Sequence, residues 1–246
     1  MKAPICPPPT LDLAESALFL DLDGTLAKIL PQPVDVRPDA ERTRVLRWLM
    51  QSMDGRVAIL SGRGLGDVDR ILEGAVTSVA AVHGLEQRMP DGALVTHLPA
   101  PGLPEAKVAL QSLANSELGL VVEDKGLSVA LHYRQAPRAE RRVRRATLQL
   151  ARSLGLVLQE GSMVSELRTP GPDKGDALTA FLSQAPFAGH VPVMVGDDLT
   201  DEHAFDSASA AGGYGVLVGA KRPSGARYWL SGVADVLDWL RAGGAR

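Results

Sequence analysis

Short apolar runs alternate with amphipathic segments near the start of the chain. Residues 17–20 and 57–60 are continuous apolar runs, each followed directly by polar residues, and such runs indicate strands buried on both faces. After Pro38, apolar residues recur at spacings of three and four, which predicts an amphipathic helix. A helix at 65–73 and a strand at 77–82 continue the alternation. This order of elements predicts a parallel sheet with helices on both faces.

The same alternation returns in the last third of the chain. The pattern predicts these elements in order: helix 174–184, strand 192–195, helix 200–210, a strand at about 214–218, and a final helix that carries Val233, Val236, Leu237 and Leu240. We therefore expect the α/β fold class, with a Rossmann-like parallel core built from both ends of the chain.

The middle of the chain has a different pattern. It predicts one helical face, formed by Val143, Ala146, Leu150 and Leu154, and four strands at 119–123, 127–133, 156–159 and 163–168. Prolines stand on both sides of this segment. We interpret it as an inserted α+β cap (lid) domain, which divides the chain into core residues 1–102, cap residues 103–170 and core residues 171–246.

Composition and charge narrow the classes of function. The chain has 246 residues, of which 45% are hydrophobic and 22% charged, as in an ordinary globular protein. The net charge of -3 gives no overall attraction to nucleic acid or to an anionic membrane. We interpret the arginines between 138 and 152 as a solvated helix face, because no aromatic residues are interleaved with them. We expect neither a nucleic-acid nor a membrane partner.

The single cysteine, Cys6, rules out a disulfide within the chain and favours a reducing compartment. The first ten residues lack the apolar core of a signal peptide, and no apolar run approaches the length of a membrane span. We therefore expect a cytoplasmic protein. The oligomeric state does not follow from the sequence, although a monomer is favoured.

Paired aspartates follow the first predicted strand, as Asp21-Leu22-Asp23-Gly24-Thr25. Ligands bind at the carboxyl ends of strands in open α/β sheets, and two close carboxylates repel unless a cation neutralises them. Oxygen ligands of this kind suit Mg²⁺. An aspartate can also attack phosphorus and form an aspartyl-phosphate. The alternative explanation is a pair of solvated aspartates in a glycine turn.

Two further segments could bind a phosphoryl group. Ser61 and Gly62 follow the second strand, where a hydroxyl and backbone N–H groups can cradle phosphate, although both residues are also ordinary turn formers. Lys174 begins a predicted helix, an unfavourable place for a cation unless an anion lies nearby. A solvated surface lysine is the alternative.

An acidic loop follows the strand at 192–195, with Asp197, Asp198, Asp201 and Glu202 within six residues. Their repulsion favours a bound cation, with Asp197 as the direct ligand. Asp198 and Asp201 would orient metal-bound water or Lys174, or cap the following helix.

The four motifs together resemble the haloacid dehalogenase superfamily of phosphotransferases. That resemblance implies that Asp21 is the nucleophile and that Asp23 is the general acid and base. It also places Thr25, Ser61, Gly62 and Lys174 on the phosphoryl group. Asp21, Asp23 (through its backbone carbonyl) and Asp197 would bind Mg²⁺, with Asp198 and Asp201 behind them.

Matches along the whole chain, including Val82-His83-Gly84 and the 132–137 segment His-Tyr-Arg-Gln-Ala-Pro, resemble the bacterial trehalose-6-phosphate phosphatases. This resemblance implies hydrolysis of trehalose 6-phosphate and contacts between the sugar and Glu123, Lys125 and Glu166 of the cap. Composition alone favours a solvated face for those three residues. Two alternatives stay open: a phosphatase of another sugar phosphate, such as sucrose phosphate or mannosyl-phosphoglycerate, and a non-catalytic phosphate-binding or phospho-accepting regulatory domain.

Overall fold

The structure, a computed structural model, describes residues 6–243 and divides into two units. The first unit contains the chain up to Val95 and again from Pro172 onward, and the second contains Thr96–Gly171. The sequence placed the start of the inserted segment at 103, within the second unit. Within the described residues no helix is long and apolar enough to cross a membrane.

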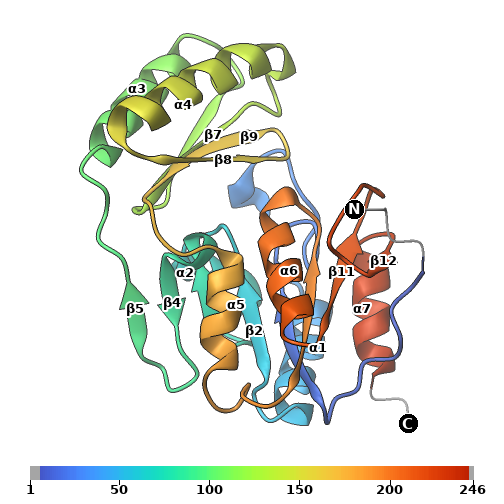
Figure 1. Ribbon diagram of the computed structural model, residues 1–246. Helices are drawn as coiled ribbons and strands as arrows, with labels where there is room; N and C mark the ends of the chain where they lie inside the picture. Colours follow the sequence, from blue (N-terminus) through green and yellow to red (C-terminus); the bar gives the residue numbers. More distant parts are fainter. Residues whose placement is uncertain (1–5, 244–246) are drawn as a thin grey trace. The chain divides into compact units, whose positions relative to one another are not determined.

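An eight-stranded sheet forms the centre of the first unit, in the order β12-β11-β10-β1-β2-β3-β4-β5 (Figure 1). The strands are β1 (Ser16–Leu20), β2 (Val57–Leu60), β3 (Ser78–Ala81), β4 (Glu86–Arg88), β5 (Leu94–Thr96), β10 (Val191–Gly196), β11 (Tyr214–Val218) and β12 (Tyr228–Leu230). The six strands from β12 to β3 are parallel, and β4 pairs with β3 antiparallel. The predicted α/β class with a parallel core is confirmed.

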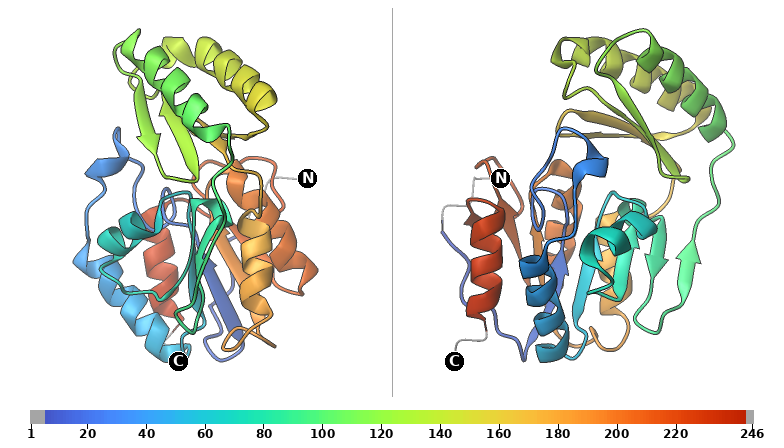
Figure 2. Two further views of the ribbon diagram at one scale, coloured as in Figure 1. Left: turned by 90° about the vertical axis from the view of Figure 1, so that its left-hand side faces the viewer. Right: turned by 180° about the vertical axis from the view of Figure 1, so that it is seen from behind.

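Helices cover both faces of this sheet (Figures 1 and 2). On one face lie α5 (Lys174–Leu182) and α6 (Glu202–Ala210), and on the other lie α1 (Ala40–Ser52), α2 (Leu65–Leu72) and α7 (Val233–Ala242). The central strands β1 and β2 are buried at every residue, which explains why they appear in the sequence as continuous apolar runs.

The second unit has a four-stranded antiparallel sheet in the order β6-β7-β9-β8. Its elements are α3 (Leu103–Asn115), β6 (Val121–Asp124), β7 (Ser128–His132), α4 (Glu140–Leu154), β8 (Val157–Gly161) and β9 (Val164–Arg168). Both helices pack on the same face of this sheet, and the other face is not covered by helices of the unit (Figure 2). Helix α3 was not predicted, because Pro104 belongs to the prolines that were interpreted as marking the edge of the inserted segment; in the structure it stands in the first turn of the helix.

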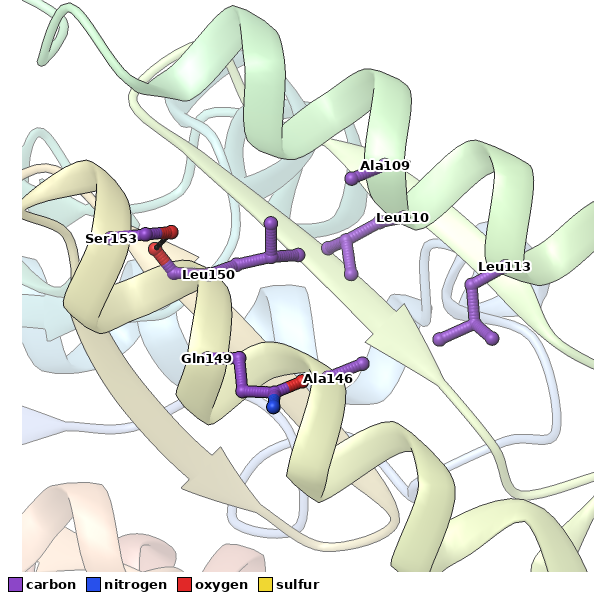
Figure 3. Close-up of a pocket in the computed structure, with 7 residues that line it drawn as sticks. All are labelled: Ala109, Leu110, Leu113, Ala146, Gln149, Leu150 and Ser153. Atoms are coloured by element: carbon purple, nitrogen blue, oxygen red, sulfur yellow. Dashed lines mark hydrogen bonds between the residues drawn. The ribbon is translucent and has the colours of Figure 1, made fainter.

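An apolar groove of about 280 Å³ lies between α3 and α4. Leu110 and Leu113 of α3 point toward Leu150 and Ala146 of α4 across it (Figure 3). Apart from Gln149 and Ser153, the side chains that line it are apolar. The groove therefore belongs to the packing between the two helices, and none of the residues with predicted chemistry lines it.

Candidate active site

The topology brings three of the sequence motifs to one edge of the main sheet. In the sheet order, β1 lies between β10 and β2, and all three strands run parallel. Asp21 directly follows β1, Ser61 follows β2 and Asp197 follows β10. Their carboxyl ends therefore meet at the same edge, where the sheet topology of α/β proteins places ligands.

Lys174 connects the acidic residues of this edge. Its Nζ lies 2.7 Å from Asp21 Oδ1 and 2.7 Å from Asp201 Oδ1, and all three residues are buried. It is the first residue of α5, which Asp173 caps by accepting hydrogen bonds from the N–H groups of Gly175 and Asp176. The two carboxylates outweigh burial, which alone would lower the pKa of Lys174, and they hold that pKa above its ordinary value.

Asp197 completes an acidic cluster with Asp21 and Asp201. One carboxylate oxygen from each of the three lies within 4.8 Å of the others. The cluster has three carboxyl groups and one ammonium, so it would carry an excess of two negative charges if all three carboxyl groups were ionised. Burial, followed by the charges of Asp21 and Asp201, raises the pKa of Asp197 to about 9. Burial also raises the pKa of Asp21 to about 7, against the opposing effect of Lys174.

The members of this cluster differ in the oxygens that they leave available. Asp201 accepts hydrogen bonds from the N–H groups of Asp197 (2.9 Å) and Asp198 (3.0 Å) with Oδ2, and from Lys174 with Oδ1. Asp198 caps the short helical turn Leu199–Asp201. Both oxygens of Asp201 therefore already accept hydrogen bonds, one from Lys174 and the other from the loop, whereas Asp21 and Asp197 are suited to bind a divalent cation through oxygen.

Asp23 lies outside this cluster and forms a two-point ion pair with Arg63. Arg63 Nε lies 2.6 Å from Asp23 Oδ2, and Nη2 lies 2.9 Å from Oδ1. Arg63 is held in turn by Asp67 and by the carbonyl of Pro33. The sequence analysis assigned no role to Arg63, because nothing in its spacing identifies which acid it meets 40 residues away.

Two buried hydroxyls, those of Thr25 and Ser61, lie in the turns that follow β1 and β2. Ser61 Oγ accepts a hydrogen bond from the N–H of Arg63. Thr25 is fully buried, and its Oγ1 has no hydrogen-bond partner within residues 6–243. A buried hydroxyl without a partner costs about 1–3 kcal/mol, so this site favours an additional polar group. Gly62, the residue after Ser61, has no room for a side chain, because a Cβ there would lie 2.5 Å from the ring of His83.

Polar residues of the second unit gather on the sheet face opposite its helices. Glu123 of β6 and Glu166 of β9 lie in one cross-strand row, each opposite Ala130 of β7. Lys125 Nζ lies 2.7 Å from Glu166 Oε2 and 3.9 Å from Glu123 Oε2. The structure therefore brings together the three cap residues that the sequence analysis selected.

Two further residues on the same face of this sheet contact Glu123 and Glu166, and neither was predicted to have a role. His132 Nε2 lies 2.8 Å from Glu123 Oε2, and Ser128 Oγ donates to Glu166 Oε1. Burial acts to raise the pKa of Glu123, but His132 and Lys125 together lower it below its ordinary value. The alternation of Ser128, Ala130 and His132 along β7 was the available signal, since residues two apart share one face of a strand.

A family model and curated relatives identify the family to which the chain is similar. A family model described as trehalose-phosphatase matches residues 19–233. The chain is 37% identical over 246 residues to a trehalose-6-phosphate phosphatase of Escherichia coli (strain K12), covering 98% of this chain and 90% of that protein. It is 35% identical over 215 residues to a probable trehalose-phosphate phosphatase of Sinorhizobium fredii, covering 87% and 81%.

A solved structure shares the fold. The structure of the C-terminal domain of the C. albicans trehalose-6-phosphate phosphatase superposes with a TM-score of 0.83. It has 20% sequence identity and covers 94% of this chain and 92% of that one. This likeness supports the two-part architecture, with a parallel sheet in one part and a smaller α+β unit in the other.

Substitution of Gly24 tests how closely the acidic loop approaches the turn after β1. Gly24 has φ +85°, and a Cβ there would lie 2.0 Å from Asp197 Oδ2. We expect Gly24→Ala to lower phosphatase activity at least about a hundredfold, because the added atom displaces Asp197. Gly74→Ala is the matched control, since Gly74 has φ +63° with nothing within 4 Å. The control should lose only about 1 kcal/mol of stability and keep its activity. Equal losses in both variants would show that backbone strain, rather than contact with Asp197, explains the effect.

The raised pKa values of Asp21 and Asp197 predict how pH changes the stability of the metal-free protein. Between about pH 5 and pH 9 the folded protein retains protons that the unfolded chain, with aspartate pKa values near 4, has already released. The free energy of unfolding in EDTA should therefore fall as pH rises, by at most about 1.4 kcal/mol per pH unit for each proton.

Urea unfolding at pH 5, 7 and 9 measures this change, and Asp197→Asn is the control because it removes one of the two groups. The variant should show a smaller fall between pH 7 and 9. Added Mg²⁺ should restore the stability of the unaltered protein at high pH. A stability that rises with pH in EDTA would contradict the assignment of buried, protonated carboxyls.

Proposed function

The chain belongs to the trehalose-phosphatase family, and from that membership we propose that it hydrolyses trehalose 6-phosphate to trehalose and phosphate. The observation that carries the proposal is the buried contact of Lys174 with Asp21 at the carboxyl end of β1. Three features suit a phosphoryl group that carries negative charge: a nucleophilic carboxylate, a fixed cation beside it, and a Thr25 hydroxyl that has no partner among the described residues.

Asp21 is the nucleophile in this proposal. Its Oδ1 accepts from Lys174, so Oδ2 is the oxygen that we expect to attack phosphorus. The new Oδ2–P bond forms as the bond from phosphorus to the sugar oxygen breaks, which leaves an aspartyl-phosphate. Attack by water on phosphorus then breaks the Oδ2–P bond and returns the Asp21 carboxylate. Lys174, Ser61, Thr25 and the backbone at Gly62 stabilise the phosphoryl oxygens.

Asp23 supplies the proton transfers. It donates a proton to the departing sugar oxygen and later accepts one from the attacking water. Both of its oxygens accept from Arg63 in this structure, so at least one must leave Arg63 before Asp23 reaches the reacting atoms. Arg63 thus orients Asp23 without belonging to the acidic cluster.

Mg²⁺ is the cation that suits the excess charge of the cluster. Asp21 and Asp197 would hold it through carboxylate oxygens, together with the backbone carbonyl of Asp23, while Asp198 and Asp201 support the loop from behind. The bound ion would offset negative charge when the phosphate approaches the carboxylate of Asp21.

The uncovered sheet face of the second unit supplies the contacts to the sugar in this proposal. Glu123 and Glu166 accept hydrogen bonds and Lys125 donates them, and sugar hydroxyls both donate and accept. Because these side chains already contact one another, they are held in place before the ligand arrives.

Phosphate release from a panel of sugar phosphates in the presence of Mg²⁺ tests the proposed activity. Trehalose 6-phosphate should be hydrolysed at least about tenfold faster, in kcat/KM, than sucrose phosphate, mannosyl-phosphoglycerate or glucose 6-phosphate. Asp21→Asn, which lacks the nucleophile, is the control that assigns the release to this site. Activity on another member of the panel but not on trehalose 6-phosphate would reject the substrate. Absence of release from any member would reject the phosphatase assignment.

Glu166→Gln tests sugar recognition by the second unit. We expect kcat/KM for trehalose 6-phosphate to fall about a hundredfold, because an isosteric amide cannot replace a buried carboxylate that contacts Lys125. Hydrolysis of a small aryl phosphate, which has no sugar, should change less than about threefold. Glu160→Gln is the matched control, since Glu160 contacts Arg144 and Ser165 on the helix-covered face of the same sheet. An equal loss on both substrates would show that Glu166 does not bind the sugar.

A further inference from the structure

Hydrogen bonds to both the N–H groups and the carbonyl groups of its backbone fix the loop that follows β10. The N–H groups of Asp197 and Asp198 donate to Asp201 Oδ2. The carbonyl groups of the same two residues accept from Nη2 of Arg222, at 2.8 Å for Asp198 and a weaker 3.4 Å for Asp197. Arg222 lies on the segment between β11 and β12, more than twenty residues later in the chain.

Arg222 is itself held in position. Its Nη1 forms an ion pair with Glu202, the first residue of α6. Glu202 also accepts from Ser224 Oγ at 2.8 Å and from the N–H of Gly225 at 2.8 Å. A carboxylate in the first turn of a helix is favourable, and the side chain of Glu202 is only 15% exposed. The guanidinium is therefore a fixed donor.

We infer that Arg222 is a positioning residue for the divalent cation of the acidic cluster. It donates to the carbonyls of Asp197 and Asp198, and so fixes the backbone of the turn after β10 from which Asp197 contributes a carboxylate to the cluster. The inference rests on the proposed function, because it requires that Asp21 and Asp197 bind the cation. Nothing in the sequence identifies Arg222, since its partners, two backbone carbonyls and Glu202, lie about twenty residues or more away in the chain.

Two effects of Arg222 on cation binding oppose each other. A guanidinium close to a cation site repels the cation, so loss of its charge alone would strengthen binding. Loss of its hydrogen bonds frees the loop and would weaken binding, as happens when residues that orient metal ligands are removed. Because the two effects differ in sign, a binding measurement separates a positioning residue from a merely nearby charge.

Isothermal titration of the full chain with Mg²⁺ alone, after treatment with EDTA and its removal, provides the test. We expect Arg222→Ala to bind Mg²⁺ about tenfold more weakly than the unaltered protein. Lys221→Ala is the matched control, because it removes a positive charge one residue away that lies over the ring of Trp229. That variant should bind Mg²⁺ within about twofold of the unaltered protein or more tightly.

Arg222→Lys keeps the positive charge but cannot donate to Glu202 and to the backbone carbonyls at the same time. This variant provides the test if Arg222→Ala fails to fold. We expect its Mg²⁺ binding to be weaker by about threefold to tenfold, with unchanged thermal unfolding in EDTA. Mg²⁺ binding by either arginine variant as tight as in the unaltered protein would overturn the inference. If the unaltered protein still binds Mg²⁺ and hydrolyses trehalose 6-phosphate, the proposed function stands. Failure of the unaltered protein to bind Mg²⁺ would overturn both.

Discussion

The contact of Lys174 with Asp21 and Asp201 is the interaction on which the rest of the site depends. An ammonium group taken out of water is costly unless charged partners accept its hydrogen bonds, and here two carboxylates do so at 2.7 Å. The contact ties the end of β1, the start of α5 and the turn before α6 to one point. Lys174 makes no hydrogen bond to Asp197 among those described, and burial beside Asp21 and Asp201 raises the pKa of Asp197 to about 9. A divalent cation would favour the ionised form of Asp197 by offsetting this repulsion.

Two glycines occur near this site because aspartate side chains pack closely against their backbone. A Cβ on Gly196 would lie 2.3 Å from Asp201 Cγ, and one on Gly24 would overlap Asp197. These carboxylates reach the cluster by passing directly over the main chain, a route open only where a side chain is absent. The acidic residues and the glycines of the two loops are therefore parts of one arrangement, although they come from opposite ends of the chain.

The parallel sheet and its motifs could be predicted because their signals are local. β1, β2 and β10 are apolar runs that end in polar residues, and the topology of parallel strands places those ends together. The three-residue strands β4, β5 and β12 are too short to show a period, and the sequence analysis missed them. The partners of two arginines could not be predicted from the sequence either. Neither the contact of Arg63 with Asp23 nor that of Arg222 with the acidic loop has a local pattern, since each depends on how distant segments pack.

The two units balance charge in different ways, and the difference follows the parts of a sugar phosphate. The acidic cluster of the first unit has three carboxylates for one buried ammonium, so it needs a cation before it can accept a phosphate dianion. In the polar row of the second unit, Lys125 contacts both Glu123 and Glu166, and His132 contacts Glu123, so each carboxylate already has a partner. A neutral ligand with many hydroxyls can exchange hydrogen bonds with such a row without bringing or removing charge. In the proposed function, the first unit therefore acts on the charged end of the substrate, and the second unit distinguishes one sugar from another.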